Sequence, residues 1–307
     1  MRAPVPDGFP HLLAPIRLGR TRAPNRVMRL ATVANLGEQN GVGDRMLAHY
    51  AAVARAFARL IHERGGEVRT SSRVTRCVRR DGVWILETAT GEVRADALIT
   101  CGGLHADRLA AMAGVRSDLM IVPFRGDYEE LAGERTSLVN GMIYPVPNPE
   151  LPFLGVHLTR TIDGRVHVGP TAVLAFKREG YRKAAFDMAD ALELMRSAGF
   201  WRMAWRFRRT GLQELSRSFS RGAVARAARR LVPELRADDL VPAPSGVRAQ
   251  AVDGRGSLLD DFEFARSEHA LHVRHVPSPA ATASIRLGQL ITEEAASAFS
   301  TLSPARS

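Results

Sequence analysis

Apolar positions recur at helical spacing between residues 45 and 64. The positions concerned are Met46, Leu47, Tyr50, Val53, Phe57, Leu60 and Ile61. Because side chains three and four residues apart share one face of a helix, this pattern predicts a helix. Gly65 and Gly66 follow at once and are expected to end it.

The pattern then changes to one typical of β-strands. Strands are predicted at residues 67–70, 73–78 and 83–88. Asp81 and Gly82 separate the last two segments. This dipeptide is a strong hairpin signal, because both residues tolerate the positive φ angles of a tight two-residue turn.

A glycine turn follows the next predicted strand. Residues 95–100 are apolar enough for a buried strand, and they run into Cys101, Gly102 and Gly103. Residues 105–113 then predict a helix. A strand, a glycine turn and a helix in this order favour a ligand at the carboxyl end of the strand.

The middle of the chain has a different order of predicted elements. Strand-like pieces (MIVPFRGDYEEL, GMIYPVP, PFLGVHLTR and RVHVGP) give way to a helical block at residues 186–235. The tail returns to strands (GVRAQAV, DDFEFAR and ALHVRHV) and closes with a helix from 280 to about 299. Five segments are predicted: 1–48, 49–115, 116–245, 246–300 and 301–307. Residues 49–115 and 246–300 are expected to form one domain, into which residues 116–245 are inserted.

Composition is that of a globular chain with a strong positive charge. The 307 residues are 45% hydrophobic, and the formal net charge is +11. Such a charge suits nucleic acid, but no helix-turn-helix spacing, zinc finger or interleaved aromatic and basic strand supports base recognition. The excess is nearly all arginine in a chain rich in Ala, Gly and Val, so no nucleic-acid partner is expected.

The two cysteines and the apolar runs concern the cellular compartment in which the protein is expected. Cys77 and Cys101 fall on different predicted strands and have no metal-ligand partners at sensible spacing, so no metal is expected. No apolar run is long enough to cross a bilayer, and the start MRAPVPDGFPHLL lacks the pattern of a secretory signal. A cytoplasmic location is therefore expected.

Several long segments resemble one known family. They are ADALITCGGLHADRLAAMAG, IVPFRGDYEEL, GMIYPVPNPELPFLGVHLTRTIDGRVHVGP, LVPAPSGVRAQAV and VPSPAATASIRLG. Together they resemble the L-2-hydroxyglutarate oxidase family, a member of the FAD-dependent group that includes D-amino-acid and glycerol-3-phosphate oxidoreductases. The resemblance runs in unbroken order from about Tyr50 to Glu294.

This resemblance implies a flavoprotein of mixed α/β and α+β class. Its parts would be an incomplete FAD-binding Rossmann-like domain and an inserted antiparallel-sheet substrate domain with helices. The implied reaction oxidises a small 2-hydroxy acid, L-2-hydroxyglutarate, to 2-oxoglutarate. Electrons would pass through FAD to oxygen or to a membrane quinone.

The N-terminal part departs from the family pattern. Members open with a strand, a G-x-G-x-x-G turn and a helix, whose amides hold the FAD pyrophosphate, and that pattern is not found there. Residues 9–50, which include LLAPIRLGRTRAPNRV and NLGEQNGVGDRMLAHY, instead resemble the start of the old yellow enzyme family. Two hypotheses follow: an FAD enzyme, or a non-catalytic fused or truncated remnant that acts as a basic surface protein. Bound flavin distinguishes them.

The expected cofactor residues lie at two turns and one strand. The resemblance places Cys101, Gly102 and Gly103 against the FAD diphosphate and the backbone of Val74 against the adenine; the alternatives are an ordinary glycine turn and a core valine. A second cofactor element precedes the last helix, where backbone amides suit the reduced flavin. It comprises Ser278, Pro279, Ala280 and Thr282. The alternative there is a plain helix cap.

The expected substrate residues come mainly from the inserted domain. His157 is the candidate base, because a neutral imidazole accepts a proton near working pH. Arg248 is the candidate carboxylate ligand, because a guanidinium fork donates two parallel hydrogen bonds. Tyr144 and Arg125 are further pocket candidates, implied by the resemblance. A structural histidine and a solvated arginine are the alternatives.

One arginine-rich stretch suggests a surface role. Residues 199–236 hold ten arginines against two glutamates, and Trp201 and Trp205 lie one helical turn apart. A basic face with an aromatic edge is typical of contact with an anionic membrane, so peripheral membrane contact is one hypothesis. A solvated charged face over a core stripe is the other.

Overall fold

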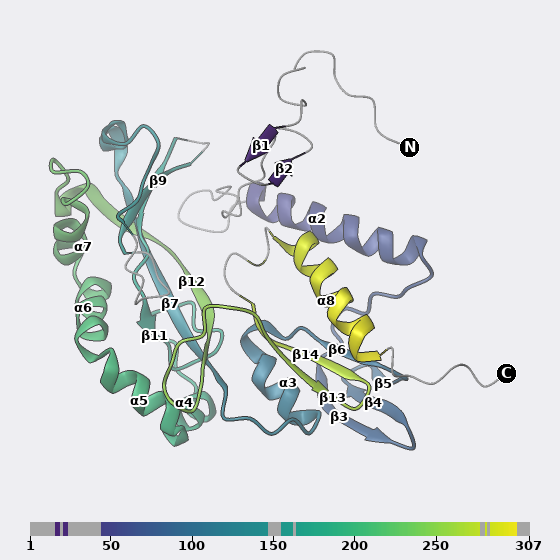
Figure 1. Ribbon diagram of the computed structural model, residues 1–307. Helices are drawn as coiled ribbons and strands as arrows, with labels where there is room; N and C mark the ends of the chain where they lie inside the picture. The colour runs from purple at the N-terminus through teal and green to yellow at the C-terminus, as the bar shows by residue number, and fades with distance from the viewer. Residues whose placement is uncertain are drawn as a thin grey trace, which may run out of the picture.

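The computed structural model describes residues 16–18, 21–23, 44–146, 155–161, 164–276, 280 and 283–299, with side chains from residue 51 onward. Two lobes make up most of it (Figure 1). Outside them, β1 (Ile16–Leu18) and β2 (Thr21–Ala23) form a short antiparallel pair. The predicted strands and helices are largely present, and the differences from the prediction have local causes.

The first lobe combines helices with two three-stranded sheets. Its elements are α2 (Asp44–Glu63), β3 (Val74–Arg80), β4 (Val83–Thr88), β5 (Gly91–Ala95), β6 (Leu98–Thr100), η1 (Gly103–His105), α3 (Ala106–Met112), β13 (Glu263–Ser267), β14 (Ala270–His275) and α8 (Ser284–Phe299). One sheet has the order β3-β4-β5 and the other β13-β14-β6. Cys77, Trp84 and Ala270 form the buried cluster at their junction, where the Trp84 indole donates to the His269 carbonyl.

The helix and hairpin predictions for this lobe are confirmed, but one strand is wrong. The predicted helix at 45–64 is α2, and Asp81 and Gly82 have φ angles of 49° and 82° in the hairpin turn. Residues 67–70 are not a strand; there Arg69 pairs with Glu67 on the surface, and no neighbouring strand supplies hydrogen bonds. The strand predicted at 95–100 is interrupted, because β5 ends at Ala95 and β6 begins at Leu98.

The second lobe is built on a six-stranded antiparallel sheet. Its elements are β7 (Met120–Leu131), η2 (Gly133–Leu138), β8 (Met142–Ile143), β9 (His157–Arg160), β10 (Val166–Gly169), β11 (Val173–Leu174), α4 (Met188–Arg196), α5 (Ala198–Arg206), α6 (Arg208–Phe219), α7 (Arg221–Ala228), η3 (Ala237–Asp239) and β12 (Leu240–Val252). The strands run in the order β11-β7-β10-β9-β8, and β12 also pairs with β7. The predicted helical block is four helices, of which α4, α5 and α7 begin after the capping residues Asp187, Ser197 and Ser220.

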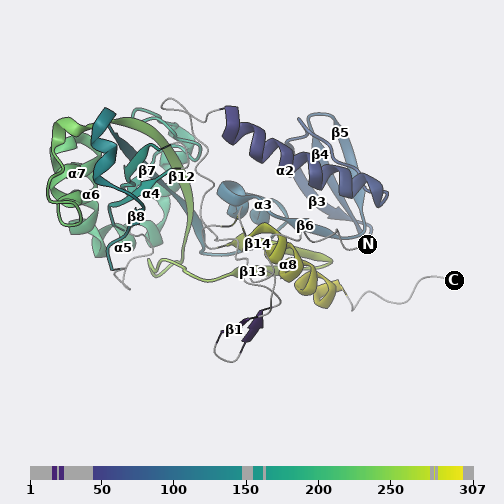
Figure 2. The ribbon, with the colours of Figure 1, turned by 90° about the horizontal axis from the view of Figure 1, so that it is seen from above.

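Helices α4–α7 cover one face of this sheet. The opposite face is turned toward the first lobe (Figures 1 and 2). On the helical side, Leu158 and Val168 of the sheet pack against Val224 and Ala225 of α7. The polar side chains of the other face are therefore free to form a site between the lobes.

The chain returns to the first lobe after β12. There β14 pairs in parallel with β6, with Leu271 opposite Ile99, although the second lobe separates the two strands in sequence. The predicted fold class is confirmed: a mixed α/β lobe interrupted by an antiparallel-sheet lobe with helices. The proposed domain limits remain predictions.

Candidate functional site

The turn after β6 presents backbone rather than side chains. Gly103 has a φ of 54°, and a Cβ added there would meet nothing within 4 Å. A Cβ on Gly102 would lie 2.6 Å from Leu109 Cδ1, because this glycine is packed against α3. Cys101, at the start of the turn, is a free cysteine. The turn is therefore packed against α3 at Gly102 and open at Gly103. An open glycine allows a ligand to approach the backbone closely.

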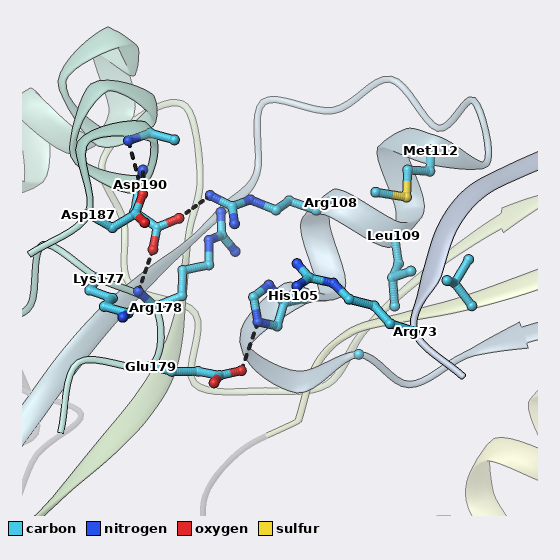
Figure 3. Close-up of a pocket in the computed structure, with 13 residues that line it drawn as sticks. Arg73, His105, Arg108, Leu109, Met112, Lys177, Arg178, Glu179, Asp187 and Asp190 are labelled. Atoms are coloured by element: carbon cyan, nitrogen blue, oxygen red, sulfur yellow. Dashed lines mark hydrogen bonds and ion pairs between the residues drawn. The ribbon is translucent and has the colours of Figure 1, made fainter. Parts of the chain in front are cut away.

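A cleft of about 680 Å³ opens beside this turn. Val74 and Gly102, two of the predicted cofactor residues, line it from the first lobe, and Lys177 lines it from the second (Figure 3). Arg73 and Lys177 are exposed cations in its wall. Arg108 and Arg178 also line the cleft, as do the carboxylates Glu179, Asp187 and Asp190. Its volume and its two exposed cations suit an anionic nucleotide.

The second predicted cofactor element is only partly described. Ser278, Pro279 and Thr282 lie outside the described residues. Ala280 is described as part of a turn, and α8 begins at Ser284 rather than at 280. Their role at the flavin stays a prediction.

His157 and Tyr144 lie together on the sheet face turned toward the first lobe. Their rings stack with centroids 4.5 Å apart and planes at 28°. His157 is paired across the sheet with Gly169, which is packed closely against the backbone of Asp127 and the ring of Tyr128. Two of the sequence-predicted substrate residues are thus brought into direct contact.

The hydrogen bond of His157 fixes its tautomer. Nδ1 lies 3.0 Å from the Gly155 carbonyl oxygen, which can only accept, so this contact requires the proton on Nδ1 and leaves a lone pair on Nε2. Burial lowers the pKa of His157, the Gly155 carbonyl opposes this, and the charge of Arg248 lowers it further. The imidazole is therefore held neutral, with Nε2 ready to accept a proton.

Arg248 approaches this pair from β12. Its charge acts on His157 and also on Tyr128, with which it shares a hydrogen bond. Burial raises the pKa of the Tyr128 phenol, and Arg248 opposes that rise. Arg248 therefore belongs to the same cluster as His157.

Tyr128 is the residue that sequence reasoning missed. Its ring meets that of His167 edge-on, with centroids 6.0 Å apart, and its Cδ1 would lie 3.3 Å from a Cβ at Gly169. The alternation of MIVPFRGDYEEL held the signal, because Tyr128 and Glu130 are two residues apart and so share a sheet face. Glu130 is paired with His167 across the sheet.

Arg125 lies elsewhere. It is 4% exposed, and its Nε donates to Asp127 Oδ1 at 2.7 Å while Nη1 donates to the Arg182 carbonyl. Asp127 also accepts from Ser218 of α6. The structure thus places Arg125 in a buried cluster beneath the helices and does not bring it to His157.

The part of the chain that the structure describes contains neither a metal-site cluster nor a membrane-spanning helix. Within the described ranges, no group of three or more His, Cys, Asp or Glu residues is arranged to hold a metal ion. Among the same residues, no helix has the length and apolar character needed to span a membrane.

Comparison with known proteins places these features in context. The protein family described as FAD dependent oxidoreductase matches residues 41–294. L-2-hydroxyglutarate dehydrogenase of Escherichia coli K12 is 45% identical over 249 residues, which are 81% of this chain and 59% of that protein. The human mitochondrial L-2-hydroxyglutarate dehydrogenase is 39% identical over 272 residues, covering 82% of this chain and 58% of its own length. The chain therefore spans somewhat more than half the length of these relatives.

A solved structure supports the fold. L-α-glycerophosphate oxidase from Mycoplasma pneumoniae, solved with FAD bound, matches with a TM-score of 0.54 at 19% identity. The match covers 80% of this chain and 54% of that one. At this identity the likeness bears on the fold alone. The resemblance of residues 9–50 to old yellow enzyme lies almost wholly outside the family match and stays a prediction.

Proposed function

Because the chain belongs to the FAD-dependent oxidoreductase family, we propose that it oxidises a small 2-hydroxy acid, most specifically L-2-hydroxyglutarate, to the 2-keto acid. The names of the relatives at 45% and 39% identity support this substrate. The observation that carries the proposal is the neutral His157, with its Nε2 lone pair, close to the cation Arg248. A base beside a carboxylate ligand is what a 2-hydroxy acid requires.

FAD is the proposed cofactor, held by the first lobe. The backbone at Cys101, Gly102 and Gly103 would approach the diphosphate, and Val74 the adenine. The cleft lined by Val74 and Gly102 and the open side of Gly103 support this placement. The segment before α8 would complete the flavin site through Ser278, Pro279, Ala280 and Thr282. FAD, when bound, supplies a two-electron acceptor.

In the proposed chemistry, His157 and Arg248 have separate tasks. Arg248 binds the C1 carboxylate of the substrate through its guanidinium fork, which fixes C2 relative to the sheet. His157 Nε2 then accepts the proton of the C2 hydroxyl as that carbon is oxidised. Tyr144 stacks on the imidazole and holds its plane. Arg125 receives no substrate contact in this scheme, because it is paired in the buried cluster with Asp127.

A visible absorption spectrum of the purified chain tests this function. FAD and then L-2-hydroxyglutarate would be added under anaerobic conditions. We expect a flavin band that bleaches with the diacid and much less with L-2-hydroxybutyrate, which lacks the second carboxylate. Protein that stays colourless with FAD, or a band that no 2-hydroxy acid bleaches, would contradict the proposal.

For the electron acceptor, we propose a membrane quinone reached through contact of α5 and α6 with an anionic membrane. Large apolar side chains are exposed there: Trp201 (54%), Trp205 (71%), Leu212 (68%) and Phe219 (73%). Arg208 lies over the Trp205 ring at 4.3 Å, so charge and aromatic surface are adjacent. This arrangement supports peripheral contact at the inner face of the membrane from a cytoplasmic location.

Vesicle flotation tests the membrane contact. We expect binding to vesicles with phosphatidylserine but not to neutral ones, and loss of binding in a Trp205→Ala, Phe219→Ala double variant. Failure to float with either vesicle type would favour a solvated face, and turnover with oxygen alone would favour the oxidase alternative.

A further inference from the structure

Arg178 is a buried cation between the two lobes. It lies in the second lobe between β11 and α4, and it is only 3% exposed. A buried charge needs partners, because leaving one unpaired is strongly unfavourable. Its partners come mainly from the first lobe. The guanidinium contacts both oxygens of Asp107, at 2.5 and 2.8 Å, and donates to the Leu104 carbonyl at 2.6 Å.

Asp107 connects three segments. It belongs to α3, and its Oδ2 also accepts from the backbone N–H of Ile121 in β7 at 2.8 Å. Leu104, the other partner of Arg178, belongs to η1. Both therefore lie within five residues of Gly102, so Arg178 fixes the stretch that immediately follows the glycine turn.

Each lobe contributes one arginine to the contact between the lobes. From the first lobe, Arg108 donates to Asp190 of α4 (Figure 3). It also donates to Glu193 of the same helix. From the second lobe, the Arg178 backbone N–H donates to Asp190 at 2.7 Å and its guanidinium to Glu193 at 3.0 Å. Burial tends to raise the pKa of Asp190, but these hydrogen bonds and the charges of both arginines hold it below its usual value. Two arginines and three carboxylates thus join the lobes.

We propose that Arg178 is a positioning residue that holds the Gly102–Gly103 turn in its FAD-binding conformation from the opposite lobe. This inference rests on the proposed function, since it concerns the affinity for FAD. A turn already held in place loses less conformational freedom when a ligand binds, so the affinity is higher. Because the cleft has walls from both lobes, the same contacts also set its width.

The dissociation constant of FAD, measured by flavin fluorescence, tests the proposal. In Arg178→Met, we expect FAD to bind at least about tenfold more weakly, because the turn loses its tie to the second lobe. In Arg108→Gln, we expect a smaller loss of about threefold, since this side chain is 29% exposed and Arg178 remains. Should Arg178→Met fail to fold, Arg108→Gln decides the question.

Arg135 provides a control with the same contact geometry at a more exposed position, since its side chain is 40% exposed against 3% for Arg178. Its guanidinium also makes a two-point contact with one carboxylate, Asp239, at 3.0 and 3.1 Å, and donates to the Glu234 carbonyl at 2.9 Å. All of these partners lie within the second lobe. Arg135→Met therefore removes a comparable set of contacts without touching the turn, and we expect its FAD affinity to stay within twofold of wild type. Equal FAD affinities in the Arg178 and Arg135 variants would overturn the proposal.

A second readout separates this inference from the proposed function. If the wild-type chain does not bind FAD, the function is wrong, but amide hydrogen exchange still reports on residues 102–112. We expect faster exchange there in Arg178→Met than in Arg135→Met. Equal exchange in the two variants would show that Arg178 does not hold the turn.

Discussion

The two lobes present their functional groups in different ways. In the first lobe the candidate cofactor site is backbone: Gly103 has a positive φ and open space, and Gly102 is packed against α3. In the second lobe the candidate site is side chains on one sheet face, where His157 and Tyr144 stack and Arg248 approaches. A backbone site depends on conformation, whereas a side-chain site depends on proton position and charge. Substitutions at these two sites should therefore impair different steps.

The largest expected effect is on the chemical step. His157→Gln keeps a polar side chain but removes the base, so the rate of flavin reduction by L-2-hydroxyglutarate should fall at least about 100-fold. The FAD affinity should not change, because His157 does not line the cleft beside the glycine turn. Stopped-flow absorbance under anaerobic conditions measures the rate. Tyr144→Phe serves as the control, since it keeps the stacked ring and should retain most of the rate.

Substrate binding should suffer next. Arg248→Met should raise the KM for L-2-hydroxyglutarate about tenfold or more, because a charge-assisted hydrogen bond contributes roughly 1.5–3 kcal/mol. Arg248→Lys should lie between this variant and wild type, since it keeps the charge but loses the fork. Steady-state kinetics with a saturating acceptor gives the values. An unchanged KM in Arg248→Met would remove this residue from the substrate site.

A smaller effect is expected for the backbone site. Gly103→Ala forces a side chain into a left-handed conformation, at a cost of about 1–2 kcal/mol, so FAD affinity should fall roughly tenfold. Gly82→Ala is the control, because Gly82 has a φ of 82° and also meets nothing within 4 Å, but it lies in the β3–β4 hairpin. Both variants should lose similar stability in thermal melts. Only the first should bind FAD more weakly in a fluorescence titration.

The pH dependence should give the smallest shift. Burial and Arg248 lower the pKa of His157 below its ordinary value of 6.5. Since only the neutral imidazole accepts a proton, kcat/KM should fall as the pH drops through this lowered pKa. Arg248→Met removes a charge that disfavours the imidazolium, so the fall should begin at a higher pH. A profile displaced toward lower pH in that variant would contradict the assignment of His157 as the base.

The sequence predicted local features well and contacts between distant segments poorly. Helical spacing predicted α2, and Asp81 with Gly82 predicted the β3–β4 turn, since both signals are local. Residues 67–70 have strand-like composition, but no strand among the described residues pairs with them, and composition alone does not determine pairing.

The candidate site shows the same limit. The glycine turn and His157 could be predicted from family-like motifs, but the place of Arg125 could not, because its partner Asp127 and the helix above it come together only in the fold. The ion network around Arg178 was equally invisible, since it joins segments about 70 residues apart. Strand alternation puts Tyr128 on the same face as Glu130, but its contact with Arg248 could be seen only in the fold.

The most direct test of the division between the lobes measures two quantities on two variants. FAD affinity and the anaerobic rate of flavin reduction at saturating FAD would be determined for His157→Gln and Gly103→Ala beside wild type. We predict that His157→Gln loses the rate and keeps the affinity, while Gly103→Ala loses affinity and keeps the rate within about twofold. Reduction of His157→Gln at the wild-type rate, or equal losses of both quantities in both variants, would contradict the separation of cofactor binding at the glycine turn from chemistry at His157.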